Sequence, residues 1–202
     1  MIDDVDDHSR TRRAFLNAVM KFPAAIVIAS VADVHAQSMM RATPACGEAG
    51  LTPPQTEGPY FKPDSPLRAS LIEPGMAGTR IIVEGVVLST ECRPIPKALV
   101  DVWHADDRGQ YDNSGYRLRG HQFTDDAGHY RVETIVPGNY PGRTRHFHVI
   151  LQAPGRRPLT TQLYFPGEPG NQRDGIFDPA LVMKVRDDGA SRRATFDFVL
   201  AV

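Results

Sequence analysis

Short stretches of alternating hydrophobic and polar residues recur from residue 80 to the end of the chain, and they predict β-strands. In residues 98–104, Val100 and Val102 fall on one face while Asp101 and Trp103 fall on the other, because successive side chains of a strand point to opposite sides. Turn formers separate such stretches, and no window shows sustained helical periodicity. The pattern predicts an all-β fold, an antiparallel β-sandwich. The predicted strands cover residues 81–88, 98–104, 123–124, 129–135, 145–151, 159–165 and 194–200.

A segment rich in proline and glycine, residues 37–79, precedes the predicted strands. Proline and glycine at this density interrupt regular helix. We therefore expect an irregular N-terminal wrap over a β-sandwich core formed by residues 80–202, with long loops. Tyr60 and Phe61 stand together in a polar part of this wrap and need either a packing partner or a ligand. The sequence has no internal repeat and no linker that would mark a second folded domain.

Residues 1–36 differ from the rest and resemble a twin-arginine export signal. Arg12 and Arg13 precede an apolar run over residues 22–32, which is too short to span a bilayer. Small residues before Gln37 offer a cleavage point, and the expected destination is the periplasm. Acidic residues ahead of the paired arginines depart from the usual signal pattern, so a short surface helix is the alternative.

Composition and charge narrow the classes of partner. The 202 residues carry a net charge of −1 at pH 7, with 41% hydrophobic and 23% charged residues. This is ordinary globular composition. It gives no basic surface for nucleic acid and no polybasic patch for a membrane. We therefore expect small molecules or further subunits as partners, and the sequence leaves a homo-oligomeric state open.

The chain has two cysteines, Cys46 and Cys92. If the protein is exported, both meet an oxidising compartment, where disulfides form and persist. A single intramolecular disulfide between them is then expected, and two buried thiols are the alternative.

The strongest chemical signal lies between Tyr140 and Leu151. His146 and His148 are two positions apart on a predicted strand, so they project to the same face about 7 Å apart, and one metal ion can bridge them. Alone, such a pair is more often polar structure than a ligand set. Tyr140 precedes the pair in a Pro-Gly turn, and Tyr111 follows the strand at 98–104.

The two tyrosines indicate which metal would fit. A phenol has an ordinary pKa of about 10, so it ionises at neutral pH only when a strong Lewis acid binds it. Two phenolates and two imidazoles favour a ferric ion over zinc or magnesium.

At this point the chain resembles the intradiol ring-cleavage dioxygenases, most closely the short protocatechuate-type and secreted members. Seven segments match in the family's order, from residue 51 to residue 165, and the resemblance continues over the whole domain that follows the signal. No single segment is decisive, but the ordered set is specific. The matching segments are residues 51–60, 92–106, 109–111, 124–130, 135–141, 143–148 and 162–165.

The resemblance implies a β-sandwich enzyme with non-haem Fe(III) as its cofactor. The implied ligands are Tyr111, Tyr140, His146 and His148. The implied reaction opens a catechol-type ring between its two hydroxylated carbons with O₂, which gives a muconate-type diacid.

The resemblance also implies roles for residues around the metal. Tyr140 would leave the metal and take up a substrate proton. Arg143 would bind substrate and stabilise negative charge on the ring, and Gln162 would lie near the substrate and O₂. Tyr60 would line the substrate pocket, with a packed loop aromatic as the alternative. The loops that shape this pocket are short, so the identity of the catechol is not implied.

Two other hypotheses remain. His104 and Asp106 have the spacing of a 2-His-1-carboxylate Fe(II) site, although a structural histidine after a buried Trp103 is the more frequent situation. A secreted β-sandwich binding module, with tyrosines that stack on a ligand and no catalytic iron, is the non-enzymatic hypothesis. The sequence contains no nucleophile elbow, zinc-protease motif or phosphate-binding glycine loop.

Overall fold

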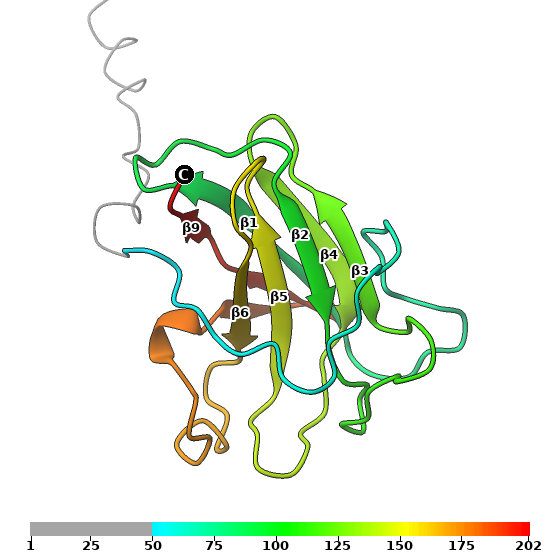
Figure 1. The fold of residues 1–202 in the computed structure, drawn as a ribbon. Helices are drawn as coiled ribbons and strands as arrows, with labels where there is room; N and C mark the ends of the chain where they lie inside the picture. Colours follow the sequence, from blue (N-terminus) through cyan, green and yellow to red (C-terminus); the bar gives the residue numbers. More distant parts are fainter. Residues whose placement is uncertain (1–49) are drawn as a thin grey trace, which may run out of the picture. The chain divides into compact units, whose positions relative to one another are not determined.

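The computed structural model describes residues 50–202, and this part of the chain is built almost entirely of β-strands (Figure 1). The predicted β-sandwich is confirmed, because the strands form two sheets. The elements are β1 (Arg80–Ser89), β2 (Leu99–Trp103), β3 (Arg119–Phe123), β4 (His129–Ile135), β5 (His146–Gln152), β6 (Leu159–Tyr164), the 3-10 helix η1 (Pro179–Leu181), β7 (Lys184–Asp188), β8 (Ser191–Thr195) and β9 (Phe198–Leu200).

One sheet has the strand order β4-β1-β8-β7, with β9 also paired to β1, and the other has the order β3-β2-β5-β6. The core lies between them. Val83 and Val132 from the first sheet and Val100 and Val149 from the second are buried in it. In β2 and β4 the positions that the hydrophobic alternation placed on the core face are buried, and Trp103 and Ile135 at the strand ends are buried as well. β1 pairs in parallel with β8 and β9, while the other pairings between these strands are antiparallel.

The end of the chain departs from the single strand predicted over residues 194–200, because the structure divides it into β8 and β9. Between the two, the backbone N–H of Val86 donates to the carboxylate of Asp197 at 2.9 Å. The carbonyl oxygen of Phe196 approaches Gly85 so closely that a Cβ there would lie 1.9 Å from it. The carboxylate of Asp197 thus takes the place of a backbone carbonyl as the acceptor for Val86. Only glycine at position 85 leaves room for the chain to bend between β8 and β9.

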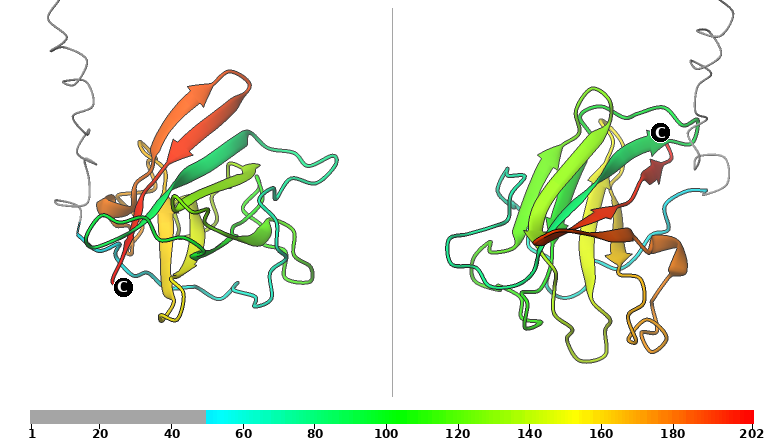
Figure 2. Two further views of the ribbon diagram at one scale, coloured as in Figure 1. Left: turned by 90° about the horizontal axis from the view of Figure 1, so that it is seen from above. Right: turned by 180° about the vertical axis from the view of Figure 1, so that it is seen from behind.

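β7 was not predicted, because its residues show no hydrophobic alternation. All but one of its five positions are exposed. β7 and β8 form a hairpin at the edge of their sheet (Figure 2). A strand of mostly charged residues at an edge discourages pairing with another chain. The residues of β7 therefore suit the edge of a sheet and not its core.

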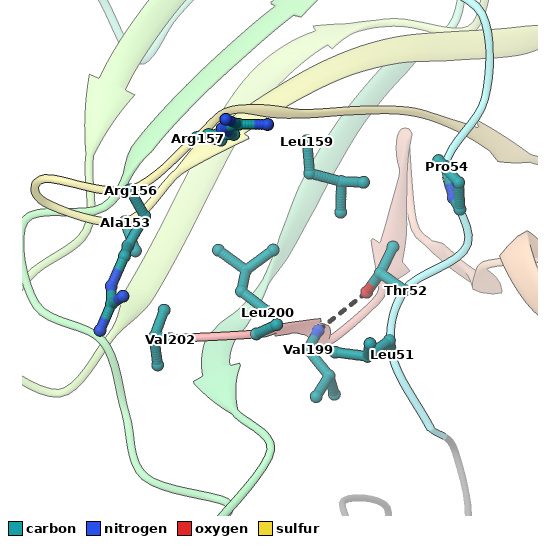
Figure 3. Close-up of a pocket in the computed structure, with 11 residues that line it drawn as sticks. Leu51, Thr52, Pro54, Ala153, Arg156, Arg157, Leu159, Val199, Leu200 and Val202 are labelled. Carbon is teal, nitrogen blue, oxygen red and sulfur yellow. Dashed lines mark hydrogen bonds between the residues drawn. The ribbon is translucent and has the colours of Figure 1, made fainter.

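The segment that precedes β1 follows the free edges of both sheets. The backbone N–H groups of Thr52, Gln55, Arg68 and Leu71 donate to carbonyl oxygens of β9, β6, β3 and β4 at 3.0, 2.8, 2.9 and 2.8 Å. The side chain of Thr52 also accepts the N–H of Val199 (Figure 3). Residues 53–66 cross the outer face of the four-stranded sheet between these anchors (Figure 1). The crossing brings Tyr60 to the end of the sheet where β5 begins.

Residues 1–49 lie outside the part of the chain that the structure describes. The predicted export signal and the cleavage before Gln37 therefore stay predictions, and so does the disulfide between Cys46 and Cys92. Cys92, the only cysteine among residues 50–202, is half-buried in the turn after β1. Within that same range, no helix has the length and apolar character to cross a bilayer.

Candidate metal centre

The segments that carry the four predicted ligands meet at one end of the four-stranded sheet (Figure 1). β5 begins there with His146 and His148, and the loops before β3 and before β5 bring Tyr111 and Tyr140. The two histidines lie on the outer face of β5, and Phe147 between them is packed in the core. All three side chains are almost completely buried.

Donor atoms of three of these residues converge on one point. The Nε2 atoms of His146 and His148 are 3.1 Å apart, and the hydroxyl oxygen of Tyr111 is 3.1 Å from Nε2 of His148. The ring of Tyr140 lies beside them, with its centre 5.7 Å from that of His146 and 5.8 Å from that of Tyr111. Ligand atoms about 2.1 Å from one metal ion lie about 3 Å from each other. The separations are therefore those of a metal-ligand set.

Where the two imidazoles meet, the protein leaves nitrogen lone pairs unsatisfied, and a cation can bind them. Nδ1 of His146 donates to the carbonyl of Thr144 at 2.7 Å, so its Nε2 carries a lone pair that faces His148. Nδ1 of His148 is buried without a hydrogen-bond partner. If Nε2 of His148 also carries a lone pair, two lone pairs face each other at 3.1 Å. If Nε2 of His148 carries the proton instead, Nε2 of His146 and the hydroxyl of Tyr111 must both accept from that single N–H. A metal ion bound to both Nε2 atoms removes this conflict, so the residues present fit a metal.

Burial controls the charge of these side chains. It lowers the pKa of His146 to about 4 and that of His148 well below its ordinary value, with further lowering from neighbouring positive charge. Burial also raises the pKa values of Tyr111 and Tyr140. The imidazoles are thus neutral and ready to donate a lone pair, and the phenols ionise only when a strong Lewis acid binds them. Within residues 50–202, no group of three His, Cys, Asp or Glu side chains could hold a metal. Phenols are therefore the donors available beside the two imidazoles.

Two neighbours fix the ring of His148. Trp103 lies directly opposite on β2 and stacks on it, with ring centres 4.9 Å apart and an angle of 6° between the planes. On the wrap, Gly58 has a positive φ of 69°, and a Cβ there would lie 3.4 Å from Cε1 of His148. Glycine thus satisfies both the backbone conformation and the close approach. The strand register and the wrap together orient this predicted ligand.

Tyr60 is packed against the two tyrosines and does not stand apart from them. Its ring stacks on that of Tyr111 at 4.4 Å with an angle of 16°, and it meets Tyr140 edge-on at 6.3 Å. The structure therefore shows the ring contacts that the packing hypothesis for Tyr60 expects. These contacts place the half-exposed ring at the rim of the site.

Arg143 connects the ligand set to Gln162. Its Nη1 donates to the hydroxyl of Tyr140 at 3.4 Å and its Nη2 to Oε1 of Gln162 at 2.5 Å. Gln162 is fully buried opposite His148 in the register of β6, and its Nε2 donates to the carbonyl of Thr56 at 2.8 Å. The wrap therefore orients the glutamine, and the glutamine helps to orient the arginine.

Two further residues of this network, Tyr164 and Asp174, were not predicted from the sequence. Tyr164 lies opposite His146 on β6, and its hydroxyl contacts both Gln162 and Arg143. The alternation within β6, where Gln162 and Tyr164 share a face, is the signal that indicates it. Asp174 accepts from Nε of Arg143 at 2.8 Å. It lies on an irregular loop, where no sequence period could reveal the contact.

The alternative site at His104 and Asp106 is used for structure. The imidazole of His104 bonds the hydroxyl of Thr134 at 2.6 Å and the carbonyl of Ala105 at 2.8 Å. The carboxylate of Asp106 pairs with Arg117 at 2.9 Å and accepts two backbone N–H groups of its own turn. Both ring nitrogens of His104 thus form hydrogen bonds, so neither is free to bind a metal.

The hollow shown in Figure 3 is separate from the candidate metal centre. It has a volume of about 460 Å³ and lies between the start of the wrap, β9 and the β5–β6 turn. Leu51, Leu159, Leu200 and Val202 line much of it, and Arg156 and Arg157 are its charged side chains. Among the described residues, its lining has no histidine, tyrosine, aspartate or glutamate side chain, so it offers no set of ligand side chains.

Comparison with known proteins gives consistent matches. A family model described as dioxygenase matches residues 56–202. Hydroxyquinol 1,2-dioxygenase from Nocardioides simplex is 31% identical over 215 aligned positions, which cover 87% of this chain and 73% of that protein. Catechol 1,2-dioxygenase from Acinetobacter baylyi is 29% identical, and the match covers 62% of this chain but only 50% of that enzyme. The chain thus spans about half the length of this catechol relative.

A solved structure is more similar in sequence. It is the dioxygenase domain of a dioxygenase and carbohydrate-binding protein fusion from the cellulolytic bacterium Streptomyces sp. SirexAA-E, and it is 57% identical to this chain. The superposition has a TM-score of 0.74 and covers 75% of this chain and 99% of that domain.

Proposed function

This chain belongs to the intradiol ring-cleavage dioxygenase family, and from this premise we propose that it is a non-haem Fe(III) enzyme that cleaves a catechol-type ring between its two hydroxylated carbons. The reaction adds both atoms of O₂ to the ring carbons and gives a muconate-type diacid. Catechol and O₂ together contain all the atoms and electrons of that product, so the reaction needs no external reductant.

The observation that carries the proposal is the position of Nε2 of His148, which lies 3.1 Å from both Nε2 of His146 and the hydroxyl oxygen of Tyr111, with the ring of Tyr140 beside them. These four residues would hold the iron. Neutral imidazoles and buried phenols are donors that favour a strongly Lewis-acidic ferric ion over zinc. Ferric iron held by these residues would supply Lewis acidity to the tyrosine and catechol oxygens.

The two tyrosines have different partners, which supports different roles. The hydroxyl of Tyr111 contacts Nε2 of His148 at 3.1 Å, whereas that of Tyr140 contacts Nη1 of Arg143 at 3.4 Å. We assign Tyr111 to permanent binding of the metal. We assign Tyr140 to proton transfer, in which its phenolate Oη would take a proton from a catechol hydroxyl and become a neutral phenol as the substrate binds.

Arg143 would stabilise the negative charge that develops on the substrate. A guanidinium fixed in a water-poor site lowers the energy of a transition state that carries such charge. Gln162 holds Nη2 of Arg143 at 2.5 Å, and because its own amide is held by Thr56, we assign it to orientation of this charge. Tyr60 forms the rim of the site and is proposed to contact the bound ring.

The identity of the catechol is open within this proposal. The names of the similar proteins include hydroxyquinol, catechol and chlorocatechol dioxygenases, which are the first substrates to assay. Protocatechuate and catechols of plant origin belong in the same panel, because the 57% identical domain comes from a cellulolytic bacterium. Oxygen uptake with each compound ranks them.

A visible absorption spectrum of protein expressed with ample iron tests the proposal. Tyrosinate bound to ferric iron gives a charge-transfer band, so we expect a red-brown protein whose band shifts when a catechol is added. A colourless, iron-free protein that consumes no O₂ with any catechol of the panel contradicts the enzyme proposal and favours the binding module.

A further inference from the structure

We propose that Asp174 is a positioning residue of this site, because its carboxylate holds both the guanidinium of Arg143 and the backbone at Thr144 that orients His146. The catalytic part of this inference rests on the function proposed above. The contacts themselves belong to the folded chain and can be measured without iron.

Asp174 lies on the loop between β6 and η1, at the same end of the sheet as the loop before β5 (Figure 1). Its side chain is only 1% exposed. Oδ2 accepts Nε–H of Arg143 at 2.8 Å and the backbone N–H of Thr144 at 3.0 Å, and Oδ1 accepts the backbone N–H of Ile176 at 3.2 Å. A buried carboxylate with three donors is stable in its charged form. Burial opposes that charge, but these donors hold the pKa of Asp174 below its usual value.

The contact with Asp174 determines where the rest of the arginine points. The guanidinium of Arg143 is planar and rigid, so a bond to Nε fixes the direction of both Nη atoms. With Nε held, Nη1 faces the hydroxyl of Tyr140 and Nη2 faces Oε1 of Gln162. Without Asp174, the glutamine and the two tyrosine hydroxyls would be the remaining partners, and the Nε edge would be free to turn.

The second contact of Asp174 continues toward a predicted metal ligand. The N–H of Thr144 is bound to Asp174, and the carbonyl of Thr144 accepts Nδ1–H of His146 at 2.7 Å. The loop that carries Asp174 also holds the Thr144 side chain, whose hydroxyl donates to Asn171 at 2.8 Å. Gly170 packs so closely that a Cβ there would lie 3.0 Å from Oγ1 of Thr144. Groups that orient a ligand in this way affect metal sites strongly when they are removed.

A neighbouring ion pair provides a matched control. Arg145 and Glu168 join the same two loops, with Nε and the carboxylate oxygen 3.2 Å apart. Both side chains are partly buried, and neither contacts the predicted ligands or Gln162. Glu168→Gln therefore removes a carboxylate between these loops without touching Arg143.

The first experiment uses metal-free protein and nitrogen-15 NMR of arginine side chains. We expect the Nε–H of Arg143 to exchange with water at least about tenfold more slowly than that of the exposed Arg173, because Asp174 holds it in a buried bond. Asp174→Asn should accelerate this exchange about tenfold or more, and Glu168→Gln should leave it unchanged. Equally fast exchange of Arg143 and Arg173 in the unaltered protein overturns the proposal, whether or not the variant folds.

The second experiment is a double-mutant cycle on kcat/KM for ring cleavage. We expect Asp174→Asn to lower kcat/KM about 10- to 100-fold, and Glu168→Gln to have no effect. If Asp174 acts mainly through Arg143, Asp174→Asn should have a much smaller effect in an Arg143→Ala background. An equal loss in both backgrounds contradicts the part of the proposal that runs through Arg143, and no loss in the first background contradicts the proposal as a whole. If the unaltered protein cleaves no catechol, the proposed function fails, and the exchange measurement still decides the role of Asp174.

Discussion

The hydroxyl oxygen of Tyr111 lies 3.1 Å from Nε2 of His148, so this tyrosine points at a predicted metal ligand. Tyr140 is oriented differently, because its hydroxyl contacts Arg143. Two residues of one chemical type thus occupy two different positions in the site. The difference leads to separate expectations for the two phenols.

We predict that Tyr111→Phe and Tyr140→Phe have different effects. Loss of the Tyr111 oxygen should weaken iron binding by at least about tenfold, since a donor directed at the metal is removed. Tyr140→Phe should retain iron but lower kcat about 100-fold or more, which is the usual contribution of a positioned acid or base. Iron content, the charge-transfer band and O₂ uptake measure these effects separately.

Tyr116→Phe is a suitable control for both variants. The hydroxyl of Tyr116 donates to the carbonyl of Pro63 at 3.0 Å, outside the ligand set. This variant should keep both iron and turnover. If Tyr111→Phe and Tyr140→Phe lose iron to the same extent, the division of roles between the two tyrosines is wrong.

The predicted export depends on residues outside the described part of the chain, and it is tested in cells. We predict that replacement of Arg12 and Arg13 by lysine keeps the protein in the cytoplasm, because a twin-arginine route reads the pair itself and not only its charge. Fractionation followed by immunoblotting measures the distribution. Lys21→Arg, which alters a neighbouring basic residue, is the control and should leave export unchanged. Equal periplasmic amounts of the double variant and the unaltered protein contradict the prediction.

Much of the fold could be predicted from the sequence, because most strands bury one face. The alternation in β2, β4 and β5 indicated both the strands and their core faces. The prediction did not extend to β7, which is an exposed edge strand. It also missed the division between β8 and β9, which depends on the contact of Val86 with the distant Asp197.

The candidate site could be predicted only in part. The two-residue spacing placed His146 and His148 on one face, but it did not indicate which tyrosines would join them. Tyr111 was a candidate donor because it follows the strand at 98–104, but its assignment to the ligand set came from the resemblance to a family, since it lies on a loop that no periodicity positions. Asp174 was not found by either route, because a buried loop carboxylate becomes visible only when the fold brings Arg143 to it.

The break between β8 and β9 gives a prediction about stability. Gly85→Ala places a Cβ only 1.9 Å from the carbonyl oxygen of Phe196, which is backbone and cannot simply rotate away. We expect the free energy of unfolding to fall by about 1–3 kcal/mol or more, as overpacking usually does. Gly175→Ala is the control, since a Cβ there meets nothing within 4 Å. Urea unfolding compares the two variants, and equal midpoints would mean that the backbone at Gly85 can move aside.

The last prediction concerns His104, which the structure uses for packing and not for a metal. Burial lowers its pKa from 6.5 to about 4, because the charged imidazolium is poorly solvated inside the protein. Well above pH 6.5 the ring is neutral in both folded and unfolded chains, so it adds no pH dependence there. As the pH falls from there toward about 4, His104 binds a proton in the unfolded chain but stays neutral in the folded chain. Stability should therefore decrease over this window and level off below it.

The size of this effect can be isolated with His104→Gln. One pKa unit corresponds to about 1.4 kcal/mol, so the ring should account for about 2 kcal/mol of lost stability between about pH 7 and about pH 5. His146 and His148 are present in both proteins, so their own contributions cancel when the two pH dependences are subtracted, and the difference contains the ring of His104 together with its charge coupling to these two neighbours. Urea unfolding of metal-free protein at several pH values measures the difference. If His104→Gln loses as much unfolding free energy on acidification as the unaltered protein, the low pKa of His104 is not the cause of that loss.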